Sequence, residues 1–238
     1  MSLGEIPGGN LRAYYKLEGL TDSSGNGFDL TNNNTVTFGA GKFANAADFG
    51  SSGTNKGLTT TTNVLSANRP SNYMVRFRFK LNSTADTTNK ILFNIITGQK
   101  YSDGYTYMSG RYSISGGNIT VNGFCDDTTQ LSMTATAVNT NWYYCDFFGF
   151  GDTSSFAIQV QNLSDRILYF ADKILGSTFD QGSAPSNKFS VGNNYLLTNQ
   201  CYAIIDQFIV DEAIYAVSVA SANRVKLRTH EILGNIVV

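Results

Sequence analysis

The chain has 238 residues, of which 42% are hydrophobic and 15% charged, and its formal net charge is -1. The apolar fraction suffices for a sizeable core, and the near-neutral charge argues against a nucleic-acid partner, because phosphate binding requires a basic excess. Residues 1–10 are polar and glycine-rich, unlike a signal peptide, and nowhere does the chain approach the roughly 20 apolar residues of a membrane helix. Composition therefore predicts a single domain over residues 1–238, made in the cytoplasm and without a membrane partner.

The first half of the chain predicts strands separated by polar loops. Residues 11–17, LRAYYKL, indicate an extended aromatic strand, and residues 21–30 follow as a loop dense in turn-forming Asp, Ser, Gly and Asn. Residues 73–80 alternate between apolar and mostly basic positions, which predicts a strand with one buried and one solvated face. The predicted solvated face carries a basic row of Arg76, Arg78 and Lys80.

The second half contains two segments that are apolar on both faces. Residues 142–148, WYYCDFF, and residues 204–210, IIDQFIV, predict central strands covered on both sides. Near the C-terminus, a serine cap, apolar residues at helical spacing and late basic residues predict a short helix. We expect this helix and an apolar tail to occupy about residues 218–238.

Several of these segments together carry a family resemblance. The strand at 11–17 and the loop at 21–30 resemble the start of a laminin-G-like domain. The late strand at 204–210 resembles the last strand of such a domain. Residues 40–49, AGKFANAADF, are similar to the Gly-Lys segment with which a strand of that family begins. Residues 142–148 begin with the tryptophan that the family has at this place. The two histidines that usually follow it in the family are tyrosines here. The resemblance to this branch of the concanavalin A-like lectin/glucanase superfamily implies an all-β fold. We expect a jelly-roll β-sandwich of two antiparallel sheets with a short C-terminal helix, a fold that hosts so many functions that the sites must decide.

Three cysteines, Cys125, Cys145 and Cys201, leave one over from any disulfide pairing. No Cys-x-x-Cys or Cys/His spacing is present, which argues against zinc. We expect either three free thiols or one disulfide with one free thiol. Cys145 lies in an apolar strand and is interpreted as a small core residue.

The inventory of acidic and histidine residues argues against catalysis. The glucanases of this superfamily use paired carboxylates on one strand. The chain has four glutamates, Glu5, Glu18, Glu212 and Glu231, and no two are expected on one strand face. The single histidine, His230, follows the last predicted strand, so no Ser-His-Asp or Cys-His arrangement is expected. We predict that the protein is not an enzyme.

The resemblance also implies a structural calcium ion, because many laminin-G-like domains hold one. Calcium is bound by carboxylate, amide and carbonyl oxygens, which the loop at 22–29 supplies. The candidate ligands are Asp22, Asn26 and Asp29, with Asp206 from the late strand. The alternative is that Asp22 and Asn26 cap a turn through their own backbone.

Sugar binding requires aromatic side chains beside polar groups. The best candidates are four tyrosines of one polar segment, Tyr101, Tyr105, Tyr107 and Tyr112. Their alternative role is cross-strand packing. The basic row on residues 76–80 could likewise face an anionic glycan, or form an ordinary solvated strand face.

The apolar tail predicts an assembly contact, since a β-branched tail left in water invites strand addition to a neighbour. Its residues are Ile232, Leu233, Ile236, Val237 and Val238. The partner would be a second copy of the chain or, if the protein belongs to a virus particle, another virion protein, unless the tail pairs within its own sheet.

Two functions from different classes follow. The first is a non-enzymatic, lectin-like protein on the surface of a bacteriophage particle, assembled in the host cytoplasm, with a structural or decorating role or binding a host glycan. The second is an extracellular carbohydrate-binding module of a secreted bacterial protein. A glycoside hydrolase is a remote third.

Overall fold

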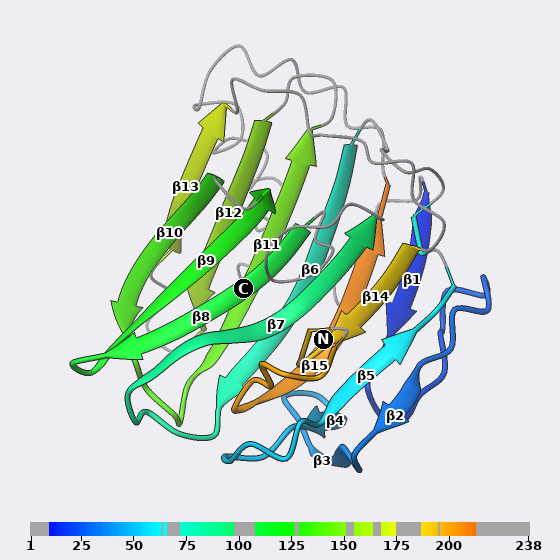
Figure 1. The fold of residues 1–238 in the computed structure, drawn as a ribbon, viewed down its shortest axis with the longest axis horizontal. Helices are drawn as coiled ribbons and strands as arrows, with labels where there is room; N and C mark the ends of the chain where they lie inside the picture. The colour runs from blue at the N-terminus through cyan, green and yellow to red at the C-terminus, as the bar shows by residue number, and fades with distance from the viewer. Residues whose placement is uncertain are drawn as a thin grey trace, which may run out of the picture.

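A computed structural model describes residues 10–62, 64–65, 72–97, 108–126, 129–150, 155–163, 168–174, 187–194 and 196–212. These residues form two antiparallel β-sheets, one lying in front of the other in Figure 1. The predicted all-β jelly-roll sandwich is thereby confirmed. The predicted helix and tail at 218–238 lie outside the described residues. Among the residues that are described, no helix is long and apolar enough to cross a membrane.

The larger sheet, sheet A, has the strand order β13-β12-β11-β6-β15-β4-β3, and β1 also pairs with β15. The two segments predicted as central strands are confirmed, because β11 lies between β12 and β6, and β15 lies between β6 and β4. The strands are β1 (Leu11–Tyr15), β3 (Thr37–Ala40), β4 (Asn45–Asp48), β6 (Asn72–Leu81), β11 (Trp142–Phe150), β12 (Ser155–Asn162), β13 (Leu168–Ile174) and β15 (Ala203–Asp211).

The second sheet, sheet B, has the order β10-β9-β8-β7-β14-β5-β2. A turn joins β8 to β9, where Gly116 and Gly117 have φ values of 55° and 77°. This left-handed pair suits the tight two-residue hairpin that the Ser115–Asn118 pairing requires. The strands are β2 (Thr31–Asn33), β5 (Gly57–Thr60), β7 (Thr87–Thr97), β8 (Met108–Ser115), β9 (Asn118–Asp126), β10 (Thr129–Thr136) and β14 (Asn187–Val191).

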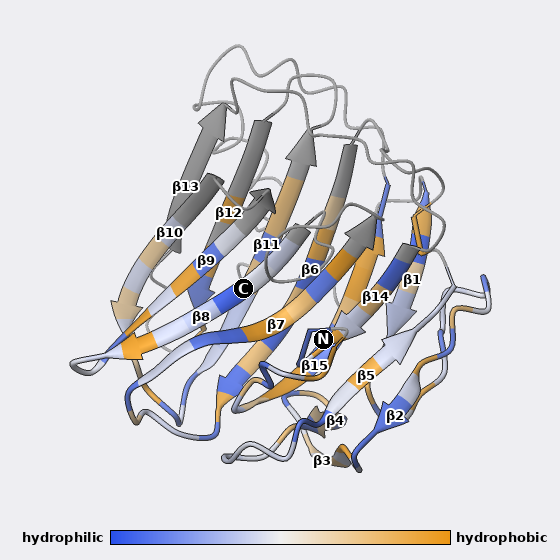
Figure 2. Cartoon of the chain, in the orientation of Figure 1, coloured by the Kyte–Doolittle hydropathy of each residue, from blue (hydrophilic) through white to orange (hydrophobic). Residues whose placement is uncertain are grey.

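Aromatic rings fill the space between the sheets. Figure 2 shows apolar and polar residues alternating along the strands, as expected where one face of each strand is turned to the core. The ring of Phe77 stacks on Phe147 and Phe208, with centroids 5.9 and 5.1 Å away, and meets Phe93 edge-on at 5.7 Å. A glycine is required beside these rings, because a Cβ on Gly110 would come within 2.4 Å of the Phe93 ring. The core therefore fixes how the two sheets are stacked.

Candidate functional site

The register of sheet A brings polar and aromatic side chains together on its outward face. Arg78 of β6 lies directly opposite Asp206 of β15 on one side and opposite Tyr144 of β11 on the other. The preceding outward position, Arg76, lies opposite Asp146. Facing residues of adjacent strands have Cβ atoms about 5 Å apart, so these side chains interact across three strands.

The arginines of this face are buried, which corrects the prediction of a solvated basic row. Arg76 is 6% exposed and donates to Asp146 twice, from Nε at 2.7 Å and from Nη2 at 3.0 Å. Arg78 is 8% exposed, and its guanidinium lies 5.5 Å from the ring centre of Tyr144. The predicted alternation along β6 is present, and Lys80 at the end of the row is half-buried, but neighbouring segments cover the two arginines.

One of these segments is the tip of the β3–β4 hairpin. The Oδ2 atom of Asp206 accepts hydrogen bonds from the backbone N–H of Lys42 at 2.8 Å and of Phe43 at 3.4 Å. Gly41 is needed at the tip, because a Cβ there would lie 2.7 Å from the Cβ of Ala46 and 2.9 Å from Oδ2 of Asp206. The pinned tip places the Phe43 ring 4.7 Å from the Arg78 guanidinium.

A β-bulge shapes the other side of Arg78. The pairing of β15 with β6 shifts between Asp206 and Ile209, and Gln207 has a left-handed φ of 51°. This conformation is uncommon for a residue other than glycine, and such strained residues concentrate at functional sites. The bulge brings Oε1 of Gln207 to Arg78, whose Nη1 donates a hydrogen bond to it.

We name this group the Arg78 cluster. Phe43 is its most open member, with 45% of its surface exposed, while Tyr14 and Gln207 are half-buried. Among the described residues, Phe43 and Leu196 are the two exposed large hydrophobic side chains, and Leu196 belongs to a different loop. The cluster comprises Tyr14, Phe43, Arg78, Tyr144, Asp206 and Gln207.

Burial perturbs the titration of the cluster. It raises the pKa of Asp206, although hydrogen bonds from the amides of Lys42 and Phe43 act in the opposite direction. Burial also lowers the pKa of Arg78, and burial followed by the charge of Asp206 raises the pKa of Tyr14. The Tyr14 hydroxyl therefore stays protonated at neutral pH, and Arg78 stays charged because its ordinary pKa is far above 7. The cluster offers an aromatic face, hydrogen-bond donors and a cation, which is equipment for binding a polar ligand.

The predicted calcium ligands lie in two separate networks. Oδ1 of Asp22 accepts the N–H of Tyr14 and Ser24 at 3.0 and 2.9 Å, and its Oδ2 accepts the Ser24 hydroxyl at 2.7 Å and the N–H of Phe28 at 3.1 Å. Oδ1 of Asp29 accepts the N–H of Asp22 at 2.8 Å. These oxygens thus face the positive ends of N–H and O–H groups, which does not suit a bound cation.

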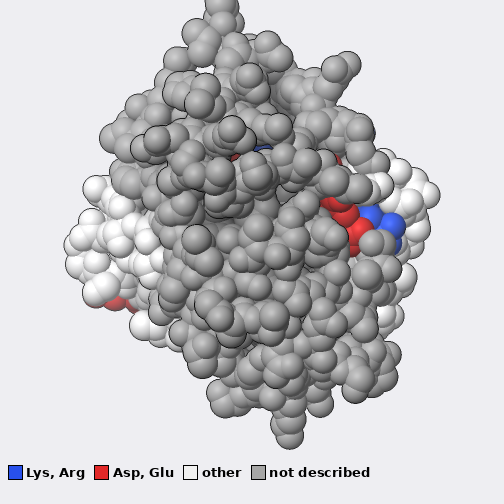
Figure 3. All heavy atoms as spheres, turned by 90° about the horizontal axis from the view of Figure 1, so that it is seen from above, with Lys and Arg blue, Asp and Glu red and all other residues white. Residues whose placement is uncertain are grey.

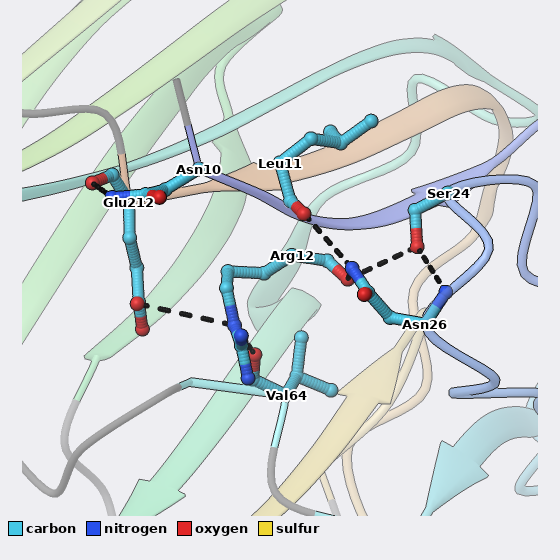
Figure 4. Close-up of polar contacts among 7 residues, drawn as sticks. All are labelled: Asn10, Leu11, Arg12, Ser24, Asn26, Val64 and Glu212. Carbon is cyan, nitrogen blue, oxygen red and sulfur yellow. Dashed lines mark hydrogen bonds and ion pairs between the residues drawn. The ribbon is translucent and has the colours of Figure 1, made fainter. Parts of the chain in front are cut away.

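Asn26 has a structural role in the same loop. Figure 4 shows its amide pointing at the carbonyl oxygens of Leu11 and Arg12, both 2.9 Å from Nδ2. Nearby, Arg12 lies 3.9 Å from Glu212 and donates to the Val64 carbonyl. The fourth candidate, Asp206, belongs instead to the Arg78 cluster.

No group of three or more His, Cys, Asp or Glu side chains suited to a metal ion occurs among the described residues. Asp22 caps the turn as the alternative has it, whereas the side chain of Asn26 ties the loop to the carbonyl groups of β1. Calcium binding itself is untested, and melting experiments in calcium and in chelator decide it.

The predicted sugar-binding tyrosines are only partly described. Tyr112 lies on β8 and is fully buried, its ring near Phe79 and its hydroxyl accepting the N–H of Tyr202 at 2.8 Å. Tyr112 is therefore a core residue, and its prediction as a sugar platform is wrong. Tyr101, Tyr105 and Tyr107 lie outside the described residues, in the stretch of chain between β7 and β8.

Sheet B also has a polar outward face. Across β14, β7 and β8 it carries Ser190, Asn94 and Ser109, which the register places opposite one another. All three are buried, and Oδ1 of Asn94 is buried without a hydrogen-bond partner. This face lacks an exposed aromatic side chain among the described residues, so the Arg78 cluster is the stronger candidate.

The remaining predictions concern the cysteines and the tail. Cys145 and Cys201 are buried free thiols, which confirms the core interpretation of Cys145, and burial raises the pKa of both. The side chain of Cys125 is not among those described. The assembly residues Ile232, Leu233, Ile236, Val237 and Val238 also lie outside the described residues.

Charged groups on the described surface are sparse and mixed. In the view from above (Figure 3), the basic atoms that show at the edge of the molecule lie beside acidic ones. Mixed signs agree with the net charge of -1.

Sequence reasoning missed four members of the Arg78 cluster. Tyr14, Phe43, Tyr144 and Gln207 come from four separate segments, and only strand pairing brings them together. One signal was present in the sequence: Phe43 is an aromatic residue between Gly41 and Asn45, where a polar turn is expected.

Comparisons with known proteins show a likeness of fold. No family model matches the chain and no curated protein matches it by sequence, so the narrower laminin-G resemblance stays a prediction. The botulinum neurotoxin serotype C1 binding domain superposes with a TM-score of 0.58 at 9% identity, over 94% of this chain and 52% of the toxin chain. The binding domain of Paraclostridial Mosquitocidal Protein 1 gives 0.57 at 14% identity, over 93% and 52%.

A phage protein is also similar. The CBM2 module of the Lactobacillus casei BL23 phage J-1 evolved Dit gives a TM-score of 0.53 at 12% identity, covering 86% of this chain and 96% of the module. The chain thus spans about half the length of the toxin structures and nearly the whole of the phage module. The likeness is one of fold, a β-sandwich of two antiparallel sheets.

Proposed function

We propose that this protein is a non-enzymatic, glycan-binding β-sandwich domain whose binding site is the Arg78 cluster. The observation that supports it best is the exposed ring of Phe43, whose backbone amide is held by Asp206 and whose centre lies 4.7 Å from the guanidinium of Arg78. The similar structures are consistent with this role, because two are named as binding domains and one as a CBM2 module.

The cluster would bind a sugar with little rearrangement. The apolar face of a pyranose ring packs on Phe43, while its hydroxyls exchange hydrogen bonds with Tyr14, Gln207 and Arg78. Because Asp206 already fixes the hairpin tip through two backbone amides, little conformational entropy is lost on binding.

The cluster is poorly suited to glycoside hydrolysis. Such enzymes need two carboxyl groups that are free to reach the scissile bond. Asp206 is 1% exposed, and its Oδ2 already accepts hydrogen bonds from two amides, so this carboxylate is not free. The other carboxylate whose charge acts on Tyr14 is that of Glu18, which is an exposed side chain. Binding without turnover is the function that these residues support.

We place the protein on the surface of a bacteriophage particle, assembled in the host cytoplasm, where it decorates the particle or contacts a host glycan. Low charge and the likeness to a phage Dit module support this placement. An extracellular bacterial binding module is the alternative, and the likeness to toxin binding domains supports it. Mass spectrometry of purified particles from the source culture tests the placement, and absence of the protein from them favours the alternative.

A matched pair of variants tests the binding site. Glycans that bind the wild-type protein are first identified on a glycan array, and their affinities are measured by calorimetry. We expect Phe43→Ala to weaken binding at least tenfold, because the ring supplies the stacking surface. Leu196→Ala removes the other exposed large apolar side chain of the described residues, which lies in a different loop, and should leave the affinity unchanged.

Two results would contradict the proposal. Equal affinities of the Phe43→Ala and wild-type proteins would remove the cluster from the binding site. A wild-type protein that binds no glycan on a broad array would refute the function itself.

A further inference from the structure

The two arginines of β6 differ in how their charges are balanced. Arg76 is paired with Asp146 through two parallel hydrogen bonds. Arg78, two residues along the same face, forms no ion pair with any described carboxylate. Its partners are neutral: the Oε1 of Gln207 and the rings of Phe43 and Tyr144.

Asp206, the acidic residue opposite Arg78, does not form an ion pair with it. Asp206 lies opposite Arg78 in the register and attracts it electrostatically, yet its Oδ2 is directed to the amides of Lys42 and Phe43. Arg78 is nevertheless 8% exposed, and removing a guanidinium from water without an ionic partner is costly. An apolar side chain of similar size in this position would stabilise the fold more, so the presence of an arginine points to a function.

The hydrogen bonds that Arg78 forms with described residues leave part of its guanidinium without an acceptor. Aromatic rings contact a guanidinium through its flat face, whereas its N–H groups point outward in its plane. Gln207 receives a hydrogen bond from Nη1, and no other hydrogen bond from Arg78 to a described residue is present. The guanidinium therefore keeps donors that match the two oxygens of a carboxylate.

We propose that the Arg78 cluster selects sugars that carry a carboxylate, with Arg78 binding the carboxylate and Phe43 packing on the sugar ring. This inference rests on the proposed glycan-binding function and names its ligand class, an acidic glycan. The half-buried Tyr14 and Gln207 then contact the hydroxyls next to the carboxylate.

The test uses pairs of ligands that differ only in charge. Uronic acid and sialic acid oligosaccharides are each compared with the carboxyl-reduced derivative, in which the carboxylate is replaced by a hydroxymethyl group. We expect the acidic member of at least one pair to bind at least about thirtyfold more tightly, as is typical of a buried charge-assisted contact. Calorimetry with the intact 238-residue chain measures both affinities.

Three variants locate the effect. Arg78→Lys keeps the charge but loses the planar donors, so the preference for the acidic ligand should fall most of the way to unity. Lys80→Gln removes a charge from the same face of β6 and should leave the preference intact. Gln207→Ala removes the side chain that orients Arg78 and should reduce the preference, and it serves in place of Arg78→Lys if that variant fails to fold.

The possible failures can be told apart. Equal binding of acidic and carboxyl-reduced ligands, both abolished by Phe43→Ala, would overturn carboxylate selection but leave glycan binding at this site. A preference for sulfated sugars over carboxylated ones, or a preference lost equally in Lys80→Gln, would also overturn the inference. Absence of any glycan binding would overturn the proposed function and the inference together.

Discussion

Replacing Asp22 with alanine should destabilise the protein strongly, because one carboxylate organises the whole turn between β1 and β2. It accepts three backbone N–H groups and the Ser24 hydroxyl at 2.7 to 3.1 Å, and Asp22 is 6% exposed. Alanine leaves these four donors without their acceptor. The expectation concerns the free energy of unfolding and assumes no bound metal.

The expected loss follows from those contacts. A hydrogen bond to a charged group contributes about 1.5 to 3 kcal/mol, and losses within one network are not additive. We therefore expect a loss of about 3 kcal/mol, or about 6 to 12 °C in melting temperature for a domain of this size. Urea denaturation and thermal melting followed by circular dichroism measure both quantities. A loss below about 1 kcal/mol would refute the reasoning.

Asp22→Asn is the matched control, since it keeps one acceptor oxygen and should lose less. Burial acts to raise the pKa of Asp22, but hydrogen bonds from Tyr14, Ser24 and Phe28 together lower it below its usual value. The unfolded chain therefore binds protons more readily than the folded one, so the contribution of Asp22 is present at neutral pH and is lost as pH falls below about 4. The difference in the free energy of unfolding between wild type and Asp22→Asn should therefore become smaller as the pH falls below about 4.

The same melts decide the calcium question. A bound ion would raise stability by about 3 kcal/mol at a hundredfold excess over its dissociation constant. Because the Asp22 oxygens already face four donors, we expect equal midpoints in calcium and in chelator. A calcium-dependent rise that is absent in Asp22→Asn would show instead that this loop binds the ion.

Four further outcomes are expected. Gly110→Ala should lower stability by about 1 to 3 kcal/mol in urea titrations, because its Cβ would lie 2.4 Å from the Phe93 ring and 2.9 Å from the Phe147 ring. Asp206→Asn should be at least as stable as wild type at pH 7 in the same assay: burial raises the pKa of Asp206, so its ionised form costs stability as pH rises. The protein should release no reducing sugar from β-glucans, and turnover that Asp206→Asn abolishes would contradict this. Removing residues 235–238 should abolish self-association in sedimentation experiments without changing the melting temperature, whereas a monomeric full-length chain would contradict the predicted assembly contact.

The sequence predicted the architecture because strand patterning is local. The alternation in residues 73–80 and the doubly apolar segments at 142–148 and 204–210 are direct consequences of side chains pointing alternately to opposite faces of a strand. The same logic should have placed Tyr112 in the core, since it is two residues from the apolar Ile114 on the same face of β8. For Tyr112, the packing alternative holds and the sugar-platform interpretation does not.

The sequence by itself determined that the described residues are organised in β-strands, which of these strands are central, and that Cys145 is internal. It could not determine that Arg78 meets Tyr144, Phe43 and Gln207, because these residues are separated by 35 to 129 positions and meet only through strand order, register and a bulge. Patterning tells polar positions from apolar ones, but whether a polar face is wet depends on which distant segment is laid over it. Arg78 is covered because the tip of the β3–β4 hairpin is hydrogen-bonded to Asp206, which the sequence pattern of β6 does not contain.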